Sequence, residues 1–295
     1  MPPTTYGGQA VIEGVMIRGA RAMAIAVRRP DGSIASTSRP LGTLYTAALR
    51  HVPLLRGVLV LWETLALGMR ALSWSAAVAT DQVDARGEAR PLGALSWLGV
   101  ALSMTAGVAL FFLVPALSTA WLVSRLPGLA IVTIEGLLRL ALLVGYIWAI
   151  GRSAEIQRVF QYHGAEHMTI HAYEQGRELT VQAIRRCEKE HPRCGTSFLL
   201  TVGVVAIFVF ALLGSPPLWW RLASRVVLVP LIAAVAYEAI RFAGFHQQRP
   251  LVRWLFAPNL ALQWLTTRIP DDEQIQVAIA SLERAVAEDA RAGAA

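Results

Sequence analysis

The residues best suited to chemistry lie between Tyr162 and Gly176, in "YHGAEHMTIHAYEQG", which holds three of the chain's six histidines and two glutamates. On a helix that turns about 100° per residue, the three histidines and the second glutamate fall within roughly 80° of arc. The first glutamate lies beside them. One helix face therefore presents these possible metal ligands to one point: His163, Glu166, His167, His171 and Glu174.

The centre of this stretch has the spacing of a zinc site. His163 and His167 are one helical turn apart, which lets two imidazoles bind one zinc ion. Glu166 completes the HxxEH pattern of inverted zinc peptidases and is placed to take a proton from water that the metal activates. Gly164 costs a helix about 1 kcal/mol relative to alanine, so we expect another backbone to pack closely there. The alternative is a polar helix whose histidines only bond to neighbours.

A second cluster follows in "CEKEHPRCGTSF". Thr180 is a suitable N-cap for a helix that carries Cys187 and His191 on one face until Pro192 ends it, with Cys194 directly after. A disulfide between the two cysteines is disfavoured by their short, helical separation. Cys187, His191 and Cys194 can be three zinc ligands, or His191 alone can complete the site begun upstream. The alternative is a helix end with a packed cysteine.

The bulk composition places these clusters in a membrane protein. The 295 residues are 55% hydrophobic and 16% charged, and the mean hydropathy is positive. The net charge of +7 comes from scattered arginines and one lysine, a distribution that excludes a nucleic-acid-binding surface and fits membrane topology. No cleavable signal is recognisable between Met1 and Gly19. The lipid bilayer is therefore the expected partner.

Four apolar runs are candidates for membrane-spanning helices, since about 20 residues cross the hydrocarbon core. They are Leu95 to Val123, Leu129 to Ile150, Phe198 to Leu213 and Leu218 to Phe242. The fourth carries Arg221 and Arg225 near its start, which we expect to snorkel toward the outer surface.

Basic residues predict the orientation. Ten precede residue 91, seven lie in 152–193 and six follow residue 240, whereas the opposite side has only Arg125, Arg221 and Arg225. By the positive-inside rule both termini and the histidine-rich loop face the cytoplasm, and the protein is a multi-pass protein of the plasma membrane. A cytoplasmic position also keeps the cysteines reduced.

The remaining segments complete a mainly α fold with about four transmembrane helices, interfacial amphipathic helices and a small N-terminal β-element. We expect a β-hairpin or meander in 1–40, an amphipathic surface helix and polar linker in 41–94, and a transmembrane hairpin in 95–150. A membrane span is the alternative for the helix in 54–79. The cytoplasmic histidine-rich loop is 151–197 and a second hairpin is 198–243. An interfacial segment and a cytoplasmic helix with the apolar pattern Ile275, Ala278, Ile279, Leu282, Val286 occupy 244–295.

Charged residues at membrane depth need partners. Glu135 and Arg139 are four apart in the order that favours an ion pair on a helix, for which we expect a structural role. Glu238 lies near the predicted cytoplasmic end of the fourth span, at the level of the histidines, and is a candidate third metal ligand.

Together these motifs resemble the YqhQ family of bacterial membrane proteins. The resemblance runs from about Tyr6 to Ala280 and rests on "GGQAVIEGVMIRG", "EGLLRLALLVGYI", "QYHGAEHMTIHAYEQG", "HPRCGTSF" and "LTTRIPDDEQIQVAI". The family has no assigned function and is often labelled a predicted metal-dependent enzyme. That label carries over to His163, Glu166, His167 and His191. Met168, the segment "APNLALQ" and Cys187 depart from the family pattern, and the last departure favours a site centred on His163 and His167.

Two functions fit the sequence. The first is a cytoplasm-facing zinc hydrolase acting on peptides or lipids, with His163 and His167 on zinc, His191 or Glu238 completing the set, and Glu166 as general base. The second is a non-catalytic protein that assembles, inserts or scaffolds other membrane proteins. An open coordination position distinguishes them, because catalytic zinc keeps a water and structural zinc does not.

Overall fold

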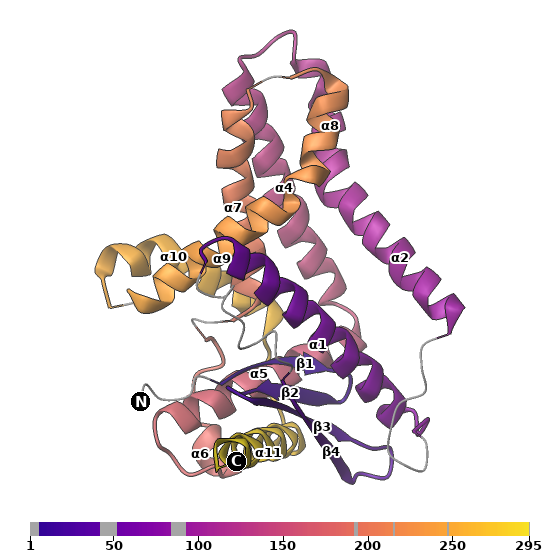
Figure 1. Cartoon of the computed structure of the whole chain (residues 1–295), viewed down its shortest axis with the longest axis vertical. Coiled ribbons are helices and arrows are strands. Elements are labelled where there is room, and N and C mark those ends of the chain that lie inside the picture. Colours follow the sequence, from indigo (N-terminus) through magenta and orange to yellow (C-terminus); the bar gives the residue numbers. More distant parts are fainter. Residues whose placement is uncertain are drawn as a thin grey trace.

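The computed structural model describes residues 6–41, 52–83, 93–191, 194–214, 216–246 and 248–294. It has two parts, a bundle of long helices and, at one end of it, a smaller unit built on a β-sheet (Figure 1). Most of the polar linker expected up to Arg90 lies outside the described residues, as does the predicted helix stop at Pro192.

The N-terminal β-element is a four-stranded antiparallel meander in the order β1-β2-β3-β4. Its strands are β1 (Gly7–Val11), β2 (Gly14–Arg18), β3 (Ala22–Arg28) and β4 (Ile34–Pro40). The turn before β4 needs Gly32, whose φ is +85°, a backbone conformation that glycine adopts without steric cost. The predicted meander is confirmed.

Helices cover both faces of this sheet. Strand alternation sends Met16 and Ile25 to one face, where α1 (Leu55–Ala79) packs through Ala71 and Trp74. Val15 and its neighbours on the other face meet α5 (Ala154–Glu174) and α11 (Asp272–Ala294). The helix predicted near the C-terminus is confirmed, because α11 buries the apolar positions read from the sequence, among them Ile275, Ala278 and Leu282.

The bundle contains the apolar segments. Its elements are α2 (Ala94–Val108), the π-helical turn η3 (Ala109–Leu113), α3 (Val114–Ser118), the 3₁₀ turn η4 (Ala120–Leu122), α4 (Gly128–Ile150), α7 (Thr196–Leu212), α8 (Leu218–Val227) and α9 (Val229–Phe245). Two further helices, α6 (Val181–Ile184) and α10 (Pro250–Thr266), flank the α5 region and the base of the bundle.

Fewer helices can cross a membrane than the four expected. Among the described residues, Trp97–Leu122 and Gly128–Ile150 are long and apolar enough, and α8 with α9 makes a third if this pair, bent by 49°, is one span. The helix α7 is apolar but has 17 residues, shorter than the about 20 that a span needs. Two features account for the difference: α7 is too short for a span, and the bend after α8 divides an apolar run that looks continuous in the sequence.

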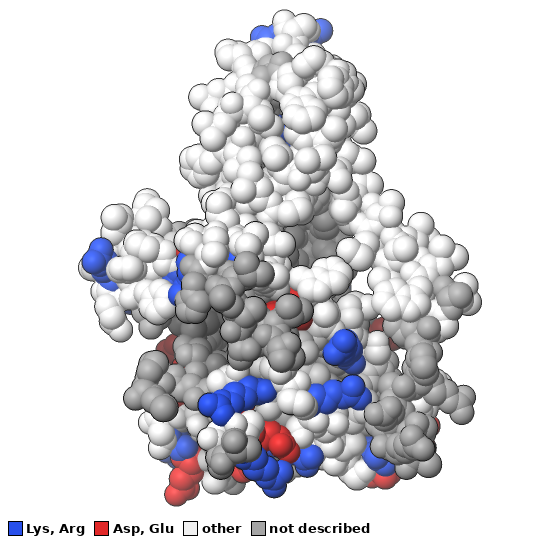
Figure 2. All heavy atoms as spheres, viewed as in Figure 1, with Lys and Arg blue, Asp and Glu red and all other residues white. Residues whose placement is uncertain are grey.

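Charge and apolar surface separate along the long axis. Lysine, arginine, aspartate and glutamate gather on the sheet-bearing unit, whereas the bundle surface is almost free of them in the view of Figure 2. Large apolar side chains of the bundle are exposed, including Leu102 and Phe208, each 68% accessible. Exposure on this scale is compatible with a lipid environment.

Arg221 and Arg225 do not snorkel as expected. Both side chains are buried in the bundle, and both bind the carboxylate of Glu135. A carboxylate at this depth supplies the counter-charge that lipid cannot, so the arginines turn inward to it. The predicted ion pair of Glu135 and Arg139 is present, with the Arg139 Nη2 atom donating to Glu135 Oε1 over 3.0 Å.

Candidate metal centre

Helix α5 holds the histidine stretch and lies between the sheet, α11 and the loop that leads to α7. Its middle is close-packed: a Cβ atom on Gly164 would come within 2.1 Å of the carbonyl oxygen of Arg268. That contact confirms the expected reason for a glycine here. The backbone N–H of Arg268 also donates to the carbonyl of Phe160, so the segment after α10 is held against α5.

Two imidazoles of α5 are fixed in orientation by backbone carbonyls. The Nδ1 atom of His163 lies 2.9 Å from the carbonyl oxygen of Thr266, and that of His167 lies 2.6 Å from the carbonyl oxygen of Lys189. Because a carbonyl oxygen only accepts, each Nδ1 carries a proton, and in the neutral imidazole this tautomer leaves Nε2 with its lone pair. This is the hydrogen-bonding arrangement that metal-bound histidines have in proteins.

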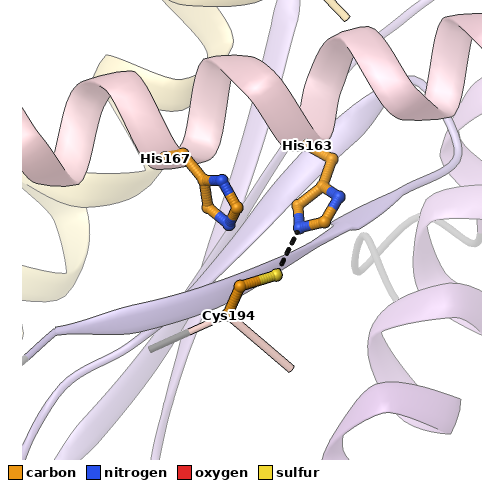
Figure 3. A group of neighbouring side chains, drawn as sticks. All are labelled: His163, His167 and Cys194. Carbon is orange, nitrogen blue, oxygen red and sulfur yellow. Dashed lines mark hydrogen bonds between the residues drawn. The ribbon is translucent and has the colours of Figure 1, made fainter. Parts of the chain in front are cut away.

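Cys194 supplies a third ligand atom at the same point. Its Sγ atom lies 3.2 Å from His163 Nε2, and the three side chains converge in Figure 3. The candidate ligand atoms of His163, His167 and Cys194 all lie within 4.8 Å of one another. Tetrahedral zinc with bonds of about 2.0–2.3 Å places its ligand atoms roughly 3.5 Å apart, so the donor set fits zinc.

The sulfur of Cys194 has its own support. The hydroxyl of Thr196 lies 3.1 Å from Sγ, and the backbone N–H of Thr196 donates to Sγ over 3.4 Å. Thr196 is the first residue of α7, where the helix dipole favours negative charge. The surroundings of this sulfur therefore suit a thiolate ligand.

Glu166 lies directly beside this group. The residue is 3% exposed, and its Oε2 atom is 3.5 Å from His167 Nε2. Burial raises the pKa of Glu166 to about 7, against the opposing effects of His163 and of the backbone N–H of Gly8. Burial also lowers the pKa of His167, so the contact between the two joins a carboxyl group to a neutral imidazole at neutral pH. A carboxyl group that titrates near neutrality is suited to general base catalysis.

The rest of the predicted face forms a second group. The ligand atoms of His171, Glu174 and His191 also lie within 4.8 Å of one another, and the His171 and His191 rings are 4.6 Å apart between centroids. The His167 and His191 centroids are 5.7 Å apart, so the two groups adjoin. Glu174 is exposed, which makes the second group the more open of the two. The structure therefore divides the single site predicted from the helix face into two possible ones.

Helix α10 fixes His191 through a residue that the sequence analysis missed. Gln263 is fully buried, its Oε1 accepts from the backbone N–H of His191 over 2.8 Å, and its Nε2 donates to the carbonyl of His191 over 2.9 Å. The same Nε2 donates to Ser197 Oγ over 3.1 Å. Gln263 lies in "APNLALQ", a segment noted in the sequence only as a departure from a pattern.

The helix predicted from Thr180 to His191 is wrong in length. The Thr180 cap is present, with its Oγ1 accepting from the backbone N–H of Ala183, but α6 ends at Ile184. Beyond it, the carbonyls of Lys189 and Glu190 accept from His167 and His171. Carbonyls that are paired within a helix are not available for such bonds. The irregular backbone after α6 therefore allows these carbonyls to bind the imidazoles.

Two other candidates lie elsewhere. Both carboxylate oxygens of Glu238 bind the guanidinium of Arg56, which ties α9 to α1. Cys187 packs against the core beneath the sheet, and its thiol donates to the carbonyl of Ala183. In the part of the chain that the structure describes, neither residue belongs to a group of possible metal ligands.

Fold and site define a mainly helical protein with apolar helices suited to a membrane and a histidine–cysteine cluster where the bundle meets the sheet-bearing unit. The chain belongs to the DUF1385 family, described as a protein family of unknown function, whose profile matches residues 52–288. It is 37% identical over 291 residues to Uncharacterized protein YqhQ of Bacillus subtilis (strain 168), an alignment that covers 95% of this chain and 91% of the relative. No solved structure matches.

Proposed function

We propose that this protein is a zinc-dependent hydrolase at the membrane surface, with its site facing the cytoplasm. The observation that carries the proposal is the convergence of His163, His167 and Cys194 beside the buried carboxyl group of Glu166. Three protein ligands leave a fourth tetrahedral position for water or substrate, as in catalytic zinc sites. Peptides and lipids are the substrate classes within reach of a site at the base of the bundle.

The roles of the residues follow from their contacts. His163 and His167 offer Nε2 lone pairs because their Nδ1 protons are held by carbonyls, and Cys194 offers a thiolate supported by Thr196. Zinc bound there supplies Lewis acidity and lowers the pKa of a water molecule. Glu166, beside His167, accepts the proton from the attacking water and passes it to the leaving group.

Metal analysis of the protein purified in detergent tests the ligand set. We expect about one zinc per chain in the wild type, and loss of that zinc in His167→Ala and Cys194→Ser. His246→Ala and Cys187→Ser are matched controls, since His246 lies at the end of α9 and Cys187 outside both ligand groups, and both should keep the metal. Metal-free wild type, or equal loss in the controls, would overturn the site.

Cobalt substitution tests the open position. A thiolate ligand gives cobalt(II) a sulfur-to-metal charge-transfer band, which should be present in the wild type and missing in Cys194→Ser. Adding acetohydroxamate should change the ligand-field bands if a coordination position is open to water. An unchanged spectrum would identify a closed structural site and favour the assembly or scaffolding function instead.

Glu166→Gln separates catalysis from binding. Because Glu166 is a proton acceptor in this proposal and not a ligand, the variant should keep the zinc and fail to restore whatever phenotype deletion of the gene produces. Full restoration would exclude the hydrolase. Loss of zinc would make Glu166 a ligand and move the general base to Glu174.

A further inference from the structure

A second polar cluster lies inside the apolar bundle. Three arginines surround the carboxylate of Glu135: Arg139 donates to Oε1 over 3.0 Å, and Arg225 donates to both oxygens over 2.7 and 2.8 Å. Arg221 donates to Oε2 over 3.1 Å. The four residues are between 1% and 5% exposed. Glu135 thus accepts four hydrogen bonds and has no capacity to balance further charge.

The cluster carries a surplus of positive charge. Three guanidinium groups and one carboxylate leave two positive charges, because arginine stays protonated in proteins. In the sequence of the bundle segments, 94–150 and 196–246, the only other acidic residue is Glu238, which pairs with Arg56. Buried charge without a counter-ion is costly at membrane depth, so this surplus points to an anionic ligand.

Among the described residues, one donor of the cluster has no hydrogen-bond partner. The Nη1 atom of Arg221 is buried and forms no hydrogen bond, although Nη2 of the same group binds Glu135 and Thr119. By contrast, Arg225 Nη1 donates to Ser224 Oγ over 3.3 Å, and Arg139 Nε donates to the carbonyl of Phe111 over 2.8 Å. Burying an N–H group without a hydrogen-bond partner costs free energy, and the cost is larger when the group is charged than when it is neutral.

The chain around the cluster is irregular in a way that suits a binding site. Phe111, whose carbonyl accepts from Arg139, lies in the π-helical turn η3, and such turns are frequent at functional sites. The helix α8, which carries Arg221 and Arg225, is bent by 49° relative to α9.

Tryptophans place this part of the bundle at the level of lipid headgroups. Trp219 and Trp220 lie in the first turn of α8, directly before Arg221, and are 70% and 40% exposed. Trp121, in η4 at the same end of the bundle, is 62% exposed and lies under the guanidinium of Arg125. Exposed tryptophans mark the membrane–water interface, where lipid phosphates lie.

We propose that Arg221, with Arg225 and Arg139, forms a binding site for a phosphate group at the end of the bundle away from the sheet. A phosphate monoester matches the surplus of two charges, and the fork of a guanidinium matches phosphate geometry in a way that lysine does not. The phosphate is that of an anionic lipid headgroup or of a free phosphate ion, and the two sources are separable.

Thermal unfolding of the full-length protein in a neutral detergent tests the site. Phosphatidic acid has a monoester phosphate and phosphatidylcholine has no net charge, so mixed micelles of each form the main comparison. At about 100 times its dissociation constant, phosphatidic acid should raise the unfolding temperature by about 5 °C. Inorganic phosphate is the second arm: a rise with phosphatidic acid alone assigns the site to lipid, and an equal rise with both assigns it to the ion.

Matched variants decide whether the cluster is responsible. Arg221→Gln should abolish the rise, whereas Arg125→Gln, which removes an exposed arginine at the same end, should retain it. No rise in the wild type, or an equal rise in Arg221→Gln, would overturn the site. If Arg221→Gln does not fold, phosphorus analysis and native mass spectrometry of delipidated and phosphatidic-acid-loaded wild type replace it. Absence of a retained phosphate-bearing molecule then overturns the proposal.

Discussion

The Nε2 atom of His163 lies 3.2 Å from the Sγ atom of Cys194, although 31 positions separate them in the chain. The imidazole comes from the middle of α5 and the sulfur from the turn that starts α7. Each has its own hydrogen-bond partner: the ring bonds to the carbonyl of Thr266, and the sulfur accepts from the backbone N–H of Thr196. Two ligands placed by separate elements and supported by separate hydrogen bonds are the basis of the first prediction.

Thr196→Val should weaken zinc binding by about 10-fold or more without unfolding the protein. The change removes the hydroxyl that lies 3.1 Å from Cys194 Sγ, and partners of this kind typically contribute 10–100-fold to metal affinity. Competition with a chromogenic chelator measures the affinity. Thr105→Val is the control, since the Thr105 hydroxyl donates to the carbonyl of Ala101 in its own helix α2. An equal loss there would contradict the assignment.

Gly164→Ala should destabilise the protein by about 1–3 kcal/mol, the usual cost of overpacking a close contact. The new Cβ would stand 2.1 Å from the carbonyl oxygen of Arg268, and backbone cannot move aside as a side-chain tip can. Gly145→Ala on α4 is the control, because nothing lies within 4 Å of its Cβ position and alanine favours a helix. Thermal unfolding in detergent compares the two, and equal stability of both variants would count against the packing argument.

Local patterns predicted the parts of the site that one helix provides. The spacing of His163, Glu166 and His167 is a property of α5 alone, and the close approach at Gly164 followed from the cost of glycine in a helix. Cys194 was recognised as a possible ligand, but its choice over Cys187 depended on where α6 ends. Local helix propensity does not predict that end. The carbonyls of Lys189 and Glu190 accept hydrogen bonds from imidazoles of α5, which keeps the segment after α6 out of a helix.

The long-range contacts of the site and of the arginine cluster could not be predicted from the sequence. Gln263 carries no signature of its role, since an amide on an apolar helix fits many environments. Arg221 and Arg225 were expected at the surface because the bend between α8 and α9, which turns them onto Glu135, does not show in hydropathy. The number of spans was overestimated because α7 is too short to cross a membrane and because this bend divides the fourth apolar run.

The loop after α5 should lie in the cytoplasm, as its basic residues indicate. Glu178→Cys, in a Cys187→Ser background, introduces an exposed thiol in that loop, and Cys194 is too buried to react readily. An impermeant maleimide should label it only after cells are opened. Ser124→Cys, at the exposed turn before α4, should be labelled on intact cells. The reverse pattern would invert the topology.

Glu135→Gln should be the most destabilising single change in the arginine cluster, by about 3–5 kcal/mol. It leaves three buried guanidinium groups without their shared carboxylate, whereas Arg139→Gln leaves Glu135 bonded to Arg221 and Arg225. Unfolding in detergent measures both. The double variant should be less unstable than the sum of the two single losses, because the partners are coupled. Strict additivity would show that Glu135 and Arg139 act independently.

Glu166 should make the metal-free protein less stable as the pH rises. Burial raises its pKa from an ordinary 4.5 to about 7, so the folded state holds the proton more tightly than the unfolded state between these values. The carboxyl group imposes no cost below about pH 4.5, a growing cost up to pH 7 and a constant one above it. At 1.36 kcal/mol per pKa unit the full cost is about 3 kcal/mol.

Comparison with Glu166→Gln isolates this effect. His167, whose pKa is lowered by burial, favours the folded state as pH rises through the range below its ordinary value. It is present in both proteins, so the comparison removes most of its contribution. The free energy of unfolding of the variant should therefore rise by about 3 kcal/mol relative to that of the wild type between about pH 4 and pH 8 in the presence of a chelator. Unfolding curves at intermediate pH trace the change. Zinc should reduce the difference in stability between the two proteins, because a nearby cation stabilises the carboxylate. A difference in stability that does not change with pH would mean that Glu166 is not a titrating buried group.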